Sequence, residues 1–217
     1  MLIDILIEGQ KALVVGGGKV GGRKTLQLLD AGAEVTVVSK EFTEKLLDLS
    51  KVGDVNLERV EVDEGFIAGL KFKPKVVIVA LDDRLLNKKI AEEARSIGAL
   101  VSVVDDPSIS DFAMPAVAKV GDIRIGVSTR GSSPAMAGII RRRVEKVITK
   151  KDVLQVELQK YARSLAKKYI PSPKERRKVL HSIIDNSEVA RLLEGGKMDE
   201  ARDLVKKIII QARRSRK

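Results

Sequence analysis

Apolar residues in the first half of the chain follow two patterns, short continuous runs and longer stretches in which they recur every three or four positions. Continuous runs are typical of strands buried in a parallel sheet, and the longer spacing is typical of helices that cover one. The runs, with one alternating segment at 55–60, predict strands over residues 12–15, 34–38, 55–60, 76–80 and 100–104. The other stretches predict helices that end near residues 30, 51, 70 and 97. This alternation predicts an α/β domain with a doubly wound, Rossmann-like parallel sheet over residues 1–112.

The pattern changes after Pro107. Residues 112–128 are typical of two strands joined at Gly121-Asp122, with apolar side chains on both faces. Because such strands need cover from another surface, a subunit interface is one candidate for this region. Helices are predicted over residues 135–149, 152–168, 174–184, 187–194 and 198–213. We therefore expect a small α+β region over 113–149 and a helical C-terminal domain over 150–217.

The first predicted strand ends in three glycines, and a helix follows at once. Gly16, Gly18 and Gly21 fit the spacing G-x-G-x-x-G, in which the first glycine allows a sharp turn, the second a close approach of phosphate and the third close helix packing. Free N–H groups at the start of the helix, at Lys19 and Val20, would then bind a pyrophosphate. A purely structural turn is the alternative. Dinucleotide binding is favoured, because a strand precedes the loop, a helix follows it, and a second strand comes at the spacing expected of a βαβ unit.

Two strand ends complete the expected cofactor site. Ser39 follows the second strand, where NAD-binding proteins usually have an acidic residue for the adenosine ribose. A hydroxyl can still bind that ribose, and Lys40 would tolerate a 2′-phosphate, so both NAD and NADP remain open. Ala80 ends the strand over 76–80 and is expected to line the ligand crevice, because carboxyl ends of strands form it.

Positive charge is concentrated in the last third of the chain. The net charge is +11, and residues 150–217 hold 19 Lys or Arg against nine Asp or Glu. Such a segment suits nucleic acid, an acidic protein or a substrate with many carboxylates, while solvated helix faces are the plain alternative. An aromatic content of 3% argues against a stacking platform for single strands.

Several classes of site are not expected. The chain has no cysteine and a single histidine, His181, so we expect no disulfide, no cysteine nucleophile and no preformed transition-metal site. Lack of cysteine also fits a reducing cytoplasm. No apolar run reaches the length of a membrane span, and residues 1–10 lack the basic start of a signal peptide.

The strand over 100–104 ends in Asp105-Asp106-Pro107. A carboxylate at a strand end beside the cofactor crevice can act as a general base. An aspartate before proline can equally serve only to shape the turn. The residues by themselves leave both readings open.

Five segments within residues 1–145 carry a family resemblance. They are residues 14–20 with Arg23 and Lys24, residues 32–38, residues 103–107, residues 112–116 and residues 128–134. In order and spacing they resemble the precorrin-2 dehydrogenase family of siroheme synthesis, whereas the later helices match only as a basic helical tail. The resemblance implies oxidation of precorrin-2 to sirohydrochlorin with NAD⁺ and, in some members, insertion of Fe²⁺ to give siroheme. It also implies a homodimer, with 113–149 as the dimerisation region.

The resemblance further implies which residues act. The aspartate that matters in the family falls on Asp105, and Asp106 is its less favoured counterpart. The substrate is a tetrapyrrole with acetate and propionate arms, which the loop containing Ser128, Arg130, Gly131 and Ser132 would bind through hydroxyl, N–H and guanidinium groups. Arg141 and Arg142 could pair with the same arms. Plain helix capping is the favoured alternative for Ser133, and solvent exposure is the alternative for these arginines and for Arg130.

Two other classes of protein compete with this interpretation. One is a dinucleotide-sensing regulator whose basic tail binds nucleic acid, although nucleic acid is not the partner that the resemblance implies. The other is a dehydrogenase of a small acid, which would be expected to have a catalytic His or Lys near the crevice. The Asp105-Asp106-Pro107 strand end offers neither.

Overall fold

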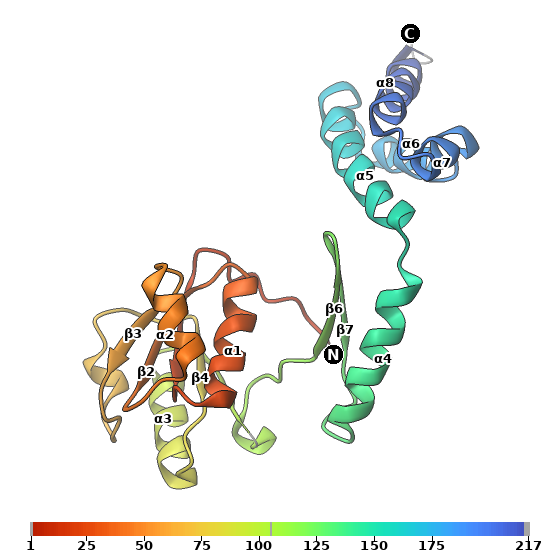
Figure 1. Cartoon of the computed structure of the whole chain (residues 1–217). Helices are drawn as coiled ribbons and strands as arrows, with labels where there is room; N and C mark the ends of the chain where they lie inside the picture. The colour runs from red at the N-terminus through yellow and green to blue at the C-terminus, as the bar shows by residue number, and fades with distance from the viewer. Residues whose placement is uncertain (1, 105, 215–217) are drawn as a thin grey trace. The chain divides into compact units, whose positions relative to one another are not determined.

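The computed structural model describes residues 2–104 and 106–214. The chain forms two compact units, Met1–Met114 and Pro115–Lys217 (Figure 1). The first unit is an α/β domain, and the second joins a hairpin and helix to a group of four helices. The predicted boundary at residues 149 and 150, inside the second unit, stays a prediction.

A five-stranded parallel sheet forms the centre of the first unit. Its strands are β1 (Lys11–Val15), β2 (Glu34–Ser39), β3 (Asn56–Arg59), β4 (Val76–Val79) and β5 (Leu100–Val103). They lie in the order β3-β2-β1-β4-β5, and all neighbouring pairs are parallel. The predicted Rossmann-like fold is therefore confirmed. In this topology the order reverses between β1 and β4, which places a crevice at the carboxyl ends of those two strands.

Alternating side chains of the strands bury two separate cores. On one face, Ala12 and Val14 pack with Leu28 of α1 (Lys19–Asp30) and Leu46 of α2 (Glu44–Lys51). On the other face, the core includes Leu13 and Val15 together with side chains of α3 (Arg84–Ser96) and of the short 3₁₀ helix η1 (Ile67–Gly69). Continuous apolar runs are required because both sheet faces are covered.

Two helices differ from the sequence prediction. The helix expected to end near residue 70 is only η1, because the N–H groups of Gly65 and Ile67 donate to the Glu93 carboxylate instead of continuing a helix. Helix α3 begins at Arg84 rather than near residue 87. Its start is set by Asp83, whose carboxylate accepts hydrogen bonds from the N–H groups of Leu85 and Leu86.

The second unit begins with an antiparallel hairpin, β6 (Ala116–Val120) and β7 (Ile123–Val127). The predicted turn at Gly121-Asp122 joins them, and α4 (Pro134–Val147) contacts both strands. Helices α5 (Lys150–Tyr169), α6 (Pro173–Ile184), α7 (Ser187–Glu194) and α8 (Met198–Arg214) share a separate core. Fully buried members of that core include Leu158, Ile183, Leu193 and Ile209. Within residues 2–104 and 106–214, none of the helices is long and apolar enough to cross a bilayer.

Candidate active site

The loop that connects β1 to α1 lies against the ends of the two strands beside β1, which are β4 and β2. Gly16 has φ +113°, a conformation that residues with a side chain rarely adopt. A Cβ at Gly16 would lie 2.4 Å from the carbonyl oxygen of Ala80, so the turn after β1 touches the residue that follows β4. A Cβ at Gly21 would lie 1.9 Å from the carbonyl oxygen of Gly16. Helix α1 therefore packs directly on the turn, and only glycine fits at both positions.

Gly18 lies at the open start of α1. A Cβ there would meet no atom within 4 Å, and Gly18 caps the helix without a side-chain hydrogen bond. The N–H groups of the first turn, including those of Lys19 and Val20, have no acceptor within the helix, and the turn has no acidic residue. Lys19 and Arg23 add positive charge near the positive end of the helix dipole. An anion would stabilise this helix end, so these residues fit a pyrophosphate.

The end of β2 lies beside the same loop. The Gly16 N–H donates to the carbonyl oxygen of Val38 at 2.9 Å. A Cβ at Gly17 would lie 3.0 Å from the Cβ of Ser39 and 2.3 Å from the carbonyl oxygen of Glu41. Gly17 must therefore lack a side chain, although the glycine motif leaves that position open. Sequence reasoning missed this requirement, for which the run of three consecutive glycines was the available signal.

A buried amide fixes the loop after β4. The Asn87 side chain accepts a hydrogen bond from the Leu81 N–H at 3.2 Å and donates one to the Leu81 carbonyl oxygen at 2.9 Å. Asn87 is only 5% exposed. The Ala80 N–H donates to the carbonyl oxygen of Val15 at 2.8 Å, so Ala80 sits between a strand and a fixed loop. Sequence reasoning missed Asn87, because one amide within a helical pattern gives no distinct signal.

The loop after β5 contains the predicted catalytic residue, Asp105, which lies outside the described residues. Its neighbour Asp106 caps the 3₁₀ helix η2 (Pro107–Ile109) by accepting hydrogen bonds from the hydroxyl and N–H of Ser108. The bond from the Ser108 hydroxyl is the main reason that the pKa of Asp106 lies below its usual value. Asp106 therefore shapes the turn as a carboxylate.

Two side chains at the far end of this loop bind the open edge of β5. The Asp111 carboxylate accepts hydrogen bonds from the Val101 N–H and from Arg95 Nε, each at 2.9 Å. Ser110 Oγ accepts one from the Val103 N–H, also at 2.9 Å. Partial burial raises the pKa of Asp111, but the bonds from Arg95 and Val101 and the Arg95 charge outweigh it and hold the pKa below its usual value. These contacts fix the segment that returns from residue 105.

The predicted substrate loop lies in the second unit, between β7 and α4. Arg130 has φ +54°, and its N–H donates to the hydroxyl of Ser128 at 3.2 Å. Gly131 also has a positive φ, +85°, and Gly131 and Ser132 are exposed. Ser133 Oγ accepts a hydrogen bond from the Met136 N–H and so caps α4. The capping alternative for Ser133 therefore holds, and Ser128 supports a tight turn.

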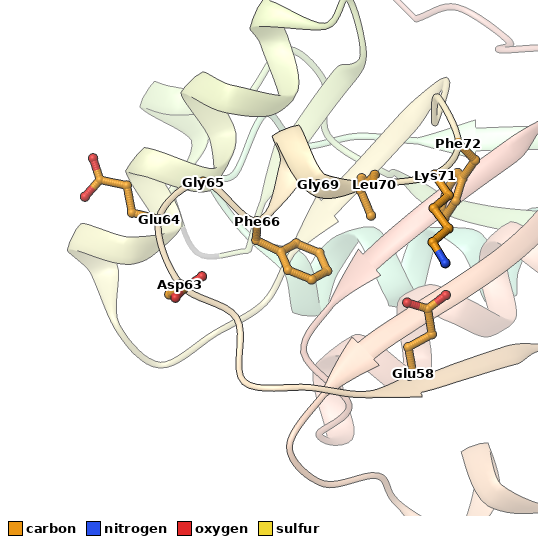
Figure 2. A pocket seen from close by; sticks show the side chains of 9 residues that line it. All are labelled: Glu58, Asp63, Glu64, Gly65, Phe66, Gly69, Leu70, Lys71 and Phe72. Carbon is orange, nitrogen blue, oxygen red and sulfur yellow. The ribbon is translucent and has the colours of Figure 1, made fainter.

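A cavity of about 510 Å³ lies apart from the glycine loop, between β3 and the segment that contains η1 (Figure 2). Its apolar walls are formed by Phe66, Leu70 and Phe72, and Glu58 and Lys71 extend into the same space (Figure 2). Three of its lining residues are acidic, Glu58, Asp63 and Glu64, against one lysine. This charge does not suit a substrate with many carboxylates. In the part of the chain that the structure describes, no group of three or more His, Asp or Glu side chains is placed to hold a metal ion.

The fold and the glycine loop define a dinucleotide-binding protein of the Rossmann class. The family model described as "Putative NAD(P)-binding" matches residues 3–116. The chain is 32% identical to the precorrin-2 dehydrogenase of Methanosarcina barkeri over 192 residues, which cover 87% of this chain and 84% of that protein. The chain belongs to the precorrin-2 dehydrogenase family, as the sequence resemblance predicted.

Two further comparisons show how much of this chain, and of each relative, the similarity covers. The siroheme synthase of Methylococcus capsulatus is 34% identical over 219 residues, which cover 99% of this chain but 44% of that protein. The chain thus spans less than half the length of this longer relative. The solved structure of SirC, a precorrin-2 dehydrogenase, superposes with a TM-score of 0.72, covering 95% of this chain and 99% of that one at 21% identity. At that identity the superposition supports the fold alone.

Proposed function

We propose that the chain is a precorrin-2 dehydrogenase that oxidises precorrin-2 to sirohydrochlorin. The observation that carries this proposal is the open, positively charged start of α1 at Gly18, in a chain of this family. The regulator considered as an alternative gains no support, since the relatives carry enzyme names. Lack of cysteine fits a cytoplasmic enzyme.

The residues of the glycine loop form the cofactor half of the proposed site. Gly16 and Gly21 hold the loop close to α1, and the N–H groups at Gly18, Lys19 and Val20 bind the pyrophosphate. Ser39 binds the adenosine ribose, and Ala80 lines the crevice at the switch point of the sheet. Bound NAD⁺ supplies the hydride acceptor.

Asp105 is the proposed base. Removing a CH–CH hydrogen pair from precorrin-2 gives up one hydride and one proton, and the carboxylate of Asp105 takes the proton. Its place after β5 supports this role, since β5 adjoins β4 and the loop returns to a fixed anchor at Ser110 and Asp111. Asp106 already serves the turn, which leaves Asp105 for the chemistry.

The second unit supplies the proposed substrate contacts and dimer contacts. Ser128, Arg130, Gly131 and Ser132 bind tetrapyrrole carboxylates, which suits an exposed loop of small polar residues with one arginine. The homodimer forms through the hairpin and α4. Exposed apolar side chains there support that role: Val117 is 42% exposed, Met136 41% and Val147 72%.

The test is anaerobic incubation with precorrin-2 and NAD⁺, followed by absorbance. We expect sirohydrochlorin and NADH to appear together, and failure of both to appear would refute the proposal. Asp105→Asn should lower kcat by about a hundredfold or more while leaving the NAD⁺ dissociation constant unchanged. The matched control Asp106→Asn should retain most of the activity, because an asparagine can still cap η2.

A second arm adds Fe²⁺ or Co²⁺ to the sirohydrochlorin that forms. Here the metal is a substrate, and its insertion requires loss of two pyrrole protons. Rapid metal insertion that depends on the enzyme and on Asp105 would identify a bifunctional enzyme. An insertion rate equal to that without enzyme would identify a dehydrogenase only.

A further inference from the structure

An amide occupies the buried face of α3, where the helix otherwise packs apolar side chains against the sheet. Asn87 lies three, four and seven positions before Ile90, Ala91 and Ala94, and all four side chains are buried. Residues at this spacing share one face of a helix. A buried amide costs free energy unless its donor and acceptor are both bonded. The side-chain oxygen and nitrogen of Asn87 both bond to Leu81, in the loop after β4.

These bonds determine the orientation of the peptide group between Ala80 and Leu81. The Leu81 N–H donates to the Asn87 side chain at 3.2 Å. In a trans peptide the N–H and the preceding carbonyl point in opposite directions, and among the described residues no peptide bond is cis. The Ala80 carbonyl oxygen therefore points away from α3 and toward the glycine loop. Its position agrees with this, since a Cβ at Gly16 would lie 2.4 Å from that oxygen.

The Ala80 carbonyl lies on the side of the glycine loop opposite Ser39. The sheet order places β2, which ends at Ser39, on one side of β1 and places β4 on the other. A dinucleotide spans the crevice at such a switch point. With the adenosine ribose at Ser39 and the pyrophosphate at the glycine loop, the nicotinamide half is expected at the end of β4. The first group of that half is a ribose, whose hydroxyls are hydrogen-bond donors.

We propose that Asn87 is a positioning residue for the cofactor: it aims the Ala80 carbonyl oxygen, which accepts a hydrogen bond from a hydroxyl of the nicotinamide ribose. The inference rests on the proposed function and adds a residue that acts through another. Without the Asn87 amide, the peptide group between residues 80 and 81 is free to rotate, and a bound ribose has to fix it at a cost in entropy. An acceptor that is held before binding avoids that cost.

The test measures the binding of three nucleotides to the full chain by calorimetry, without tetrapyrrole. NAD⁺ and ADP-ribose both carry the second ribose, whereas ADP ends at the pyrophosphate. Asn87→Leu removes both hydrogen bonds to Leu81 and keeps a side chain of similar size. It should weaken the binding of NAD⁺ and ADP-ribose by about tenfold or more and that of ADP by less than about twofold. General damage to the fold would weaken all three alike.

Two further variants accompany Asn87→Leu. Asn87→Asp retains an oxygen that can accept from the Leu81 N–H, so it should show a smaller loss of NAD⁺ and ADP-ribose affinity and again little loss for ADP. Ile90→Val is the matched control, because it truncates a fully buried side chain on the same face of α3 and leaves the bonds to Leu81 in place. It should lower the melting temperature and leave all three dissociation constants unchanged. A thermal melt of each variant separates loss of binding from loss of folding.

The outcomes separate this inference from the proposed function. An equal effect of Asn87→Leu on NAD⁺ and ADP in folded chains, or no effect on either, would overturn the positioning role and leave the dehydrogenase proposal standing. A loss for NAD⁺ without one for ADP-ribose would assign the contact to the nicotinamide ring and overturn the ribose contact. A wild-type chain that binds neither NAD⁺ nor ADP would overturn both proposals. In turnover, Asn87→Leu should raise the KM for NAD⁺ by about tenfold and leave the KM for precorrin-2 within about twofold of wild type.

Discussion

Individual glycines in the loop after β1 are required for different reasons, some for the fold and some for the ligand. Alanine substitutions distinguish the two. Gly18 has φ −73° and open space around its Cβ position, so alanine fits the fold there. We expect Gly18→Ala to change the free energy of unfolding by less than about 0.5 kcal/mol. It should weaken dinucleotide binding by about tenfold or more, because the methyl group occupies the path of the pyrophosphate. Calorimetry and a denaturant titration on the same preparation check both values.

Gly16→Ala is the matched control, with the opposite outcome. A side chain at φ +113° is strained, and its Cβ would lie 2.4 Å from the Ala80 carbonyl oxygen. We expect a loss of more than about 2 kcal/mol of stability. If Gly18→Ala destabilised the chain as much as Gly16→Ala, the open space at Gly18 would be structural and not a ligand site.

Residue identity in the sequence predicted part of the candidate site. The spacing of Gly16, Gly18 and Gly21 predicts the loop because the backbone constraint is local. Gly17 and Asn87 could not be found from motif spacing. Gly17 is required by the backbone of Glu41 in the loop after β2, and Asn87 is required by its hydrogen bonds to the loop residue Leu81, and no motif marks either partner.

At the scale of elements, the edge of β5 depends on one ionised side chain. The folded-state pKa of Asp111 is lowered below its usual 3.8, so the carboxylate stabilises the fold above that pH. This contribution is lost as pH falls below 3.8 through the folded-state pKa. We expect Asp111→Asn to cost about 1 kcal/mol at neutral pH, since the side chain is 31% exposed and its pairing with Arg95 is partly screened.

Unfolding by denaturant at a series of pH values measures this effect. The stability difference between wild type and Asp111→Asn should shrink as the pH falls below 3.8, because wild-type Asp111 then becomes protonated as well. Asp48→Asn is the control, since its carboxylate is 70% exposed and pairs with the exposed Lys51. A difference that stays constant down to the lowest pH would show that Asp111 acts through shape and not charge.

The sequence predicted which segments form strands and helices more accurately than it predicted where these elements begin and end. Buried runs such as residues 76–80 have one physical meaning in a covered sheet, and all five predicted strands are present. Ends depend on caps: Asp83 starts α3 early, and Thr149 with Asp152 forms a capping box that starts α5 at Lys150. The helix predicted after β3 is shorter in the structure, because N–H groups of that segment donate to the carboxylate of Glu93, which lies far along the chain.

At the scale of the whole molecule, charge and core are divided between the two units. The excess of Lys and Arg lies in residues 150–217, whereas the glycine loop lies in the first unit. Pattern alone could not assign a role to that excess, because solvated helix faces and a surface for carboxylates have the same composition. Family membership favours the second use, since a tetrapyrrole with acetate and propionate arms is the substrate we propose.

Separate cores imply that damage to one unit leaves the cofactor site of the other intact. Leu158 is fully buried among α5–α8, and Leu158→Ala should remove about 2–5 kcal/mol from the stability of that unit. The NAD⁺ dissociation constant of the Leu158→Ala chain should stay within about twofold of wild type under conditions where both units remain folded.

The matched control is Leu13→Ala, an equal truncation in the sheet core. It should instead weaken NAD⁺ binding, because Leu13 supports the strand that carries the glycine loop. Adding saturating NAD⁺ should therefore raise the melting temperature of the sheet unit and not that of the helical unit. A Leu158→Ala chain that folds but loses NAD⁺ affinity would contradict this division and show that the helical unit contributes to the cofactor site.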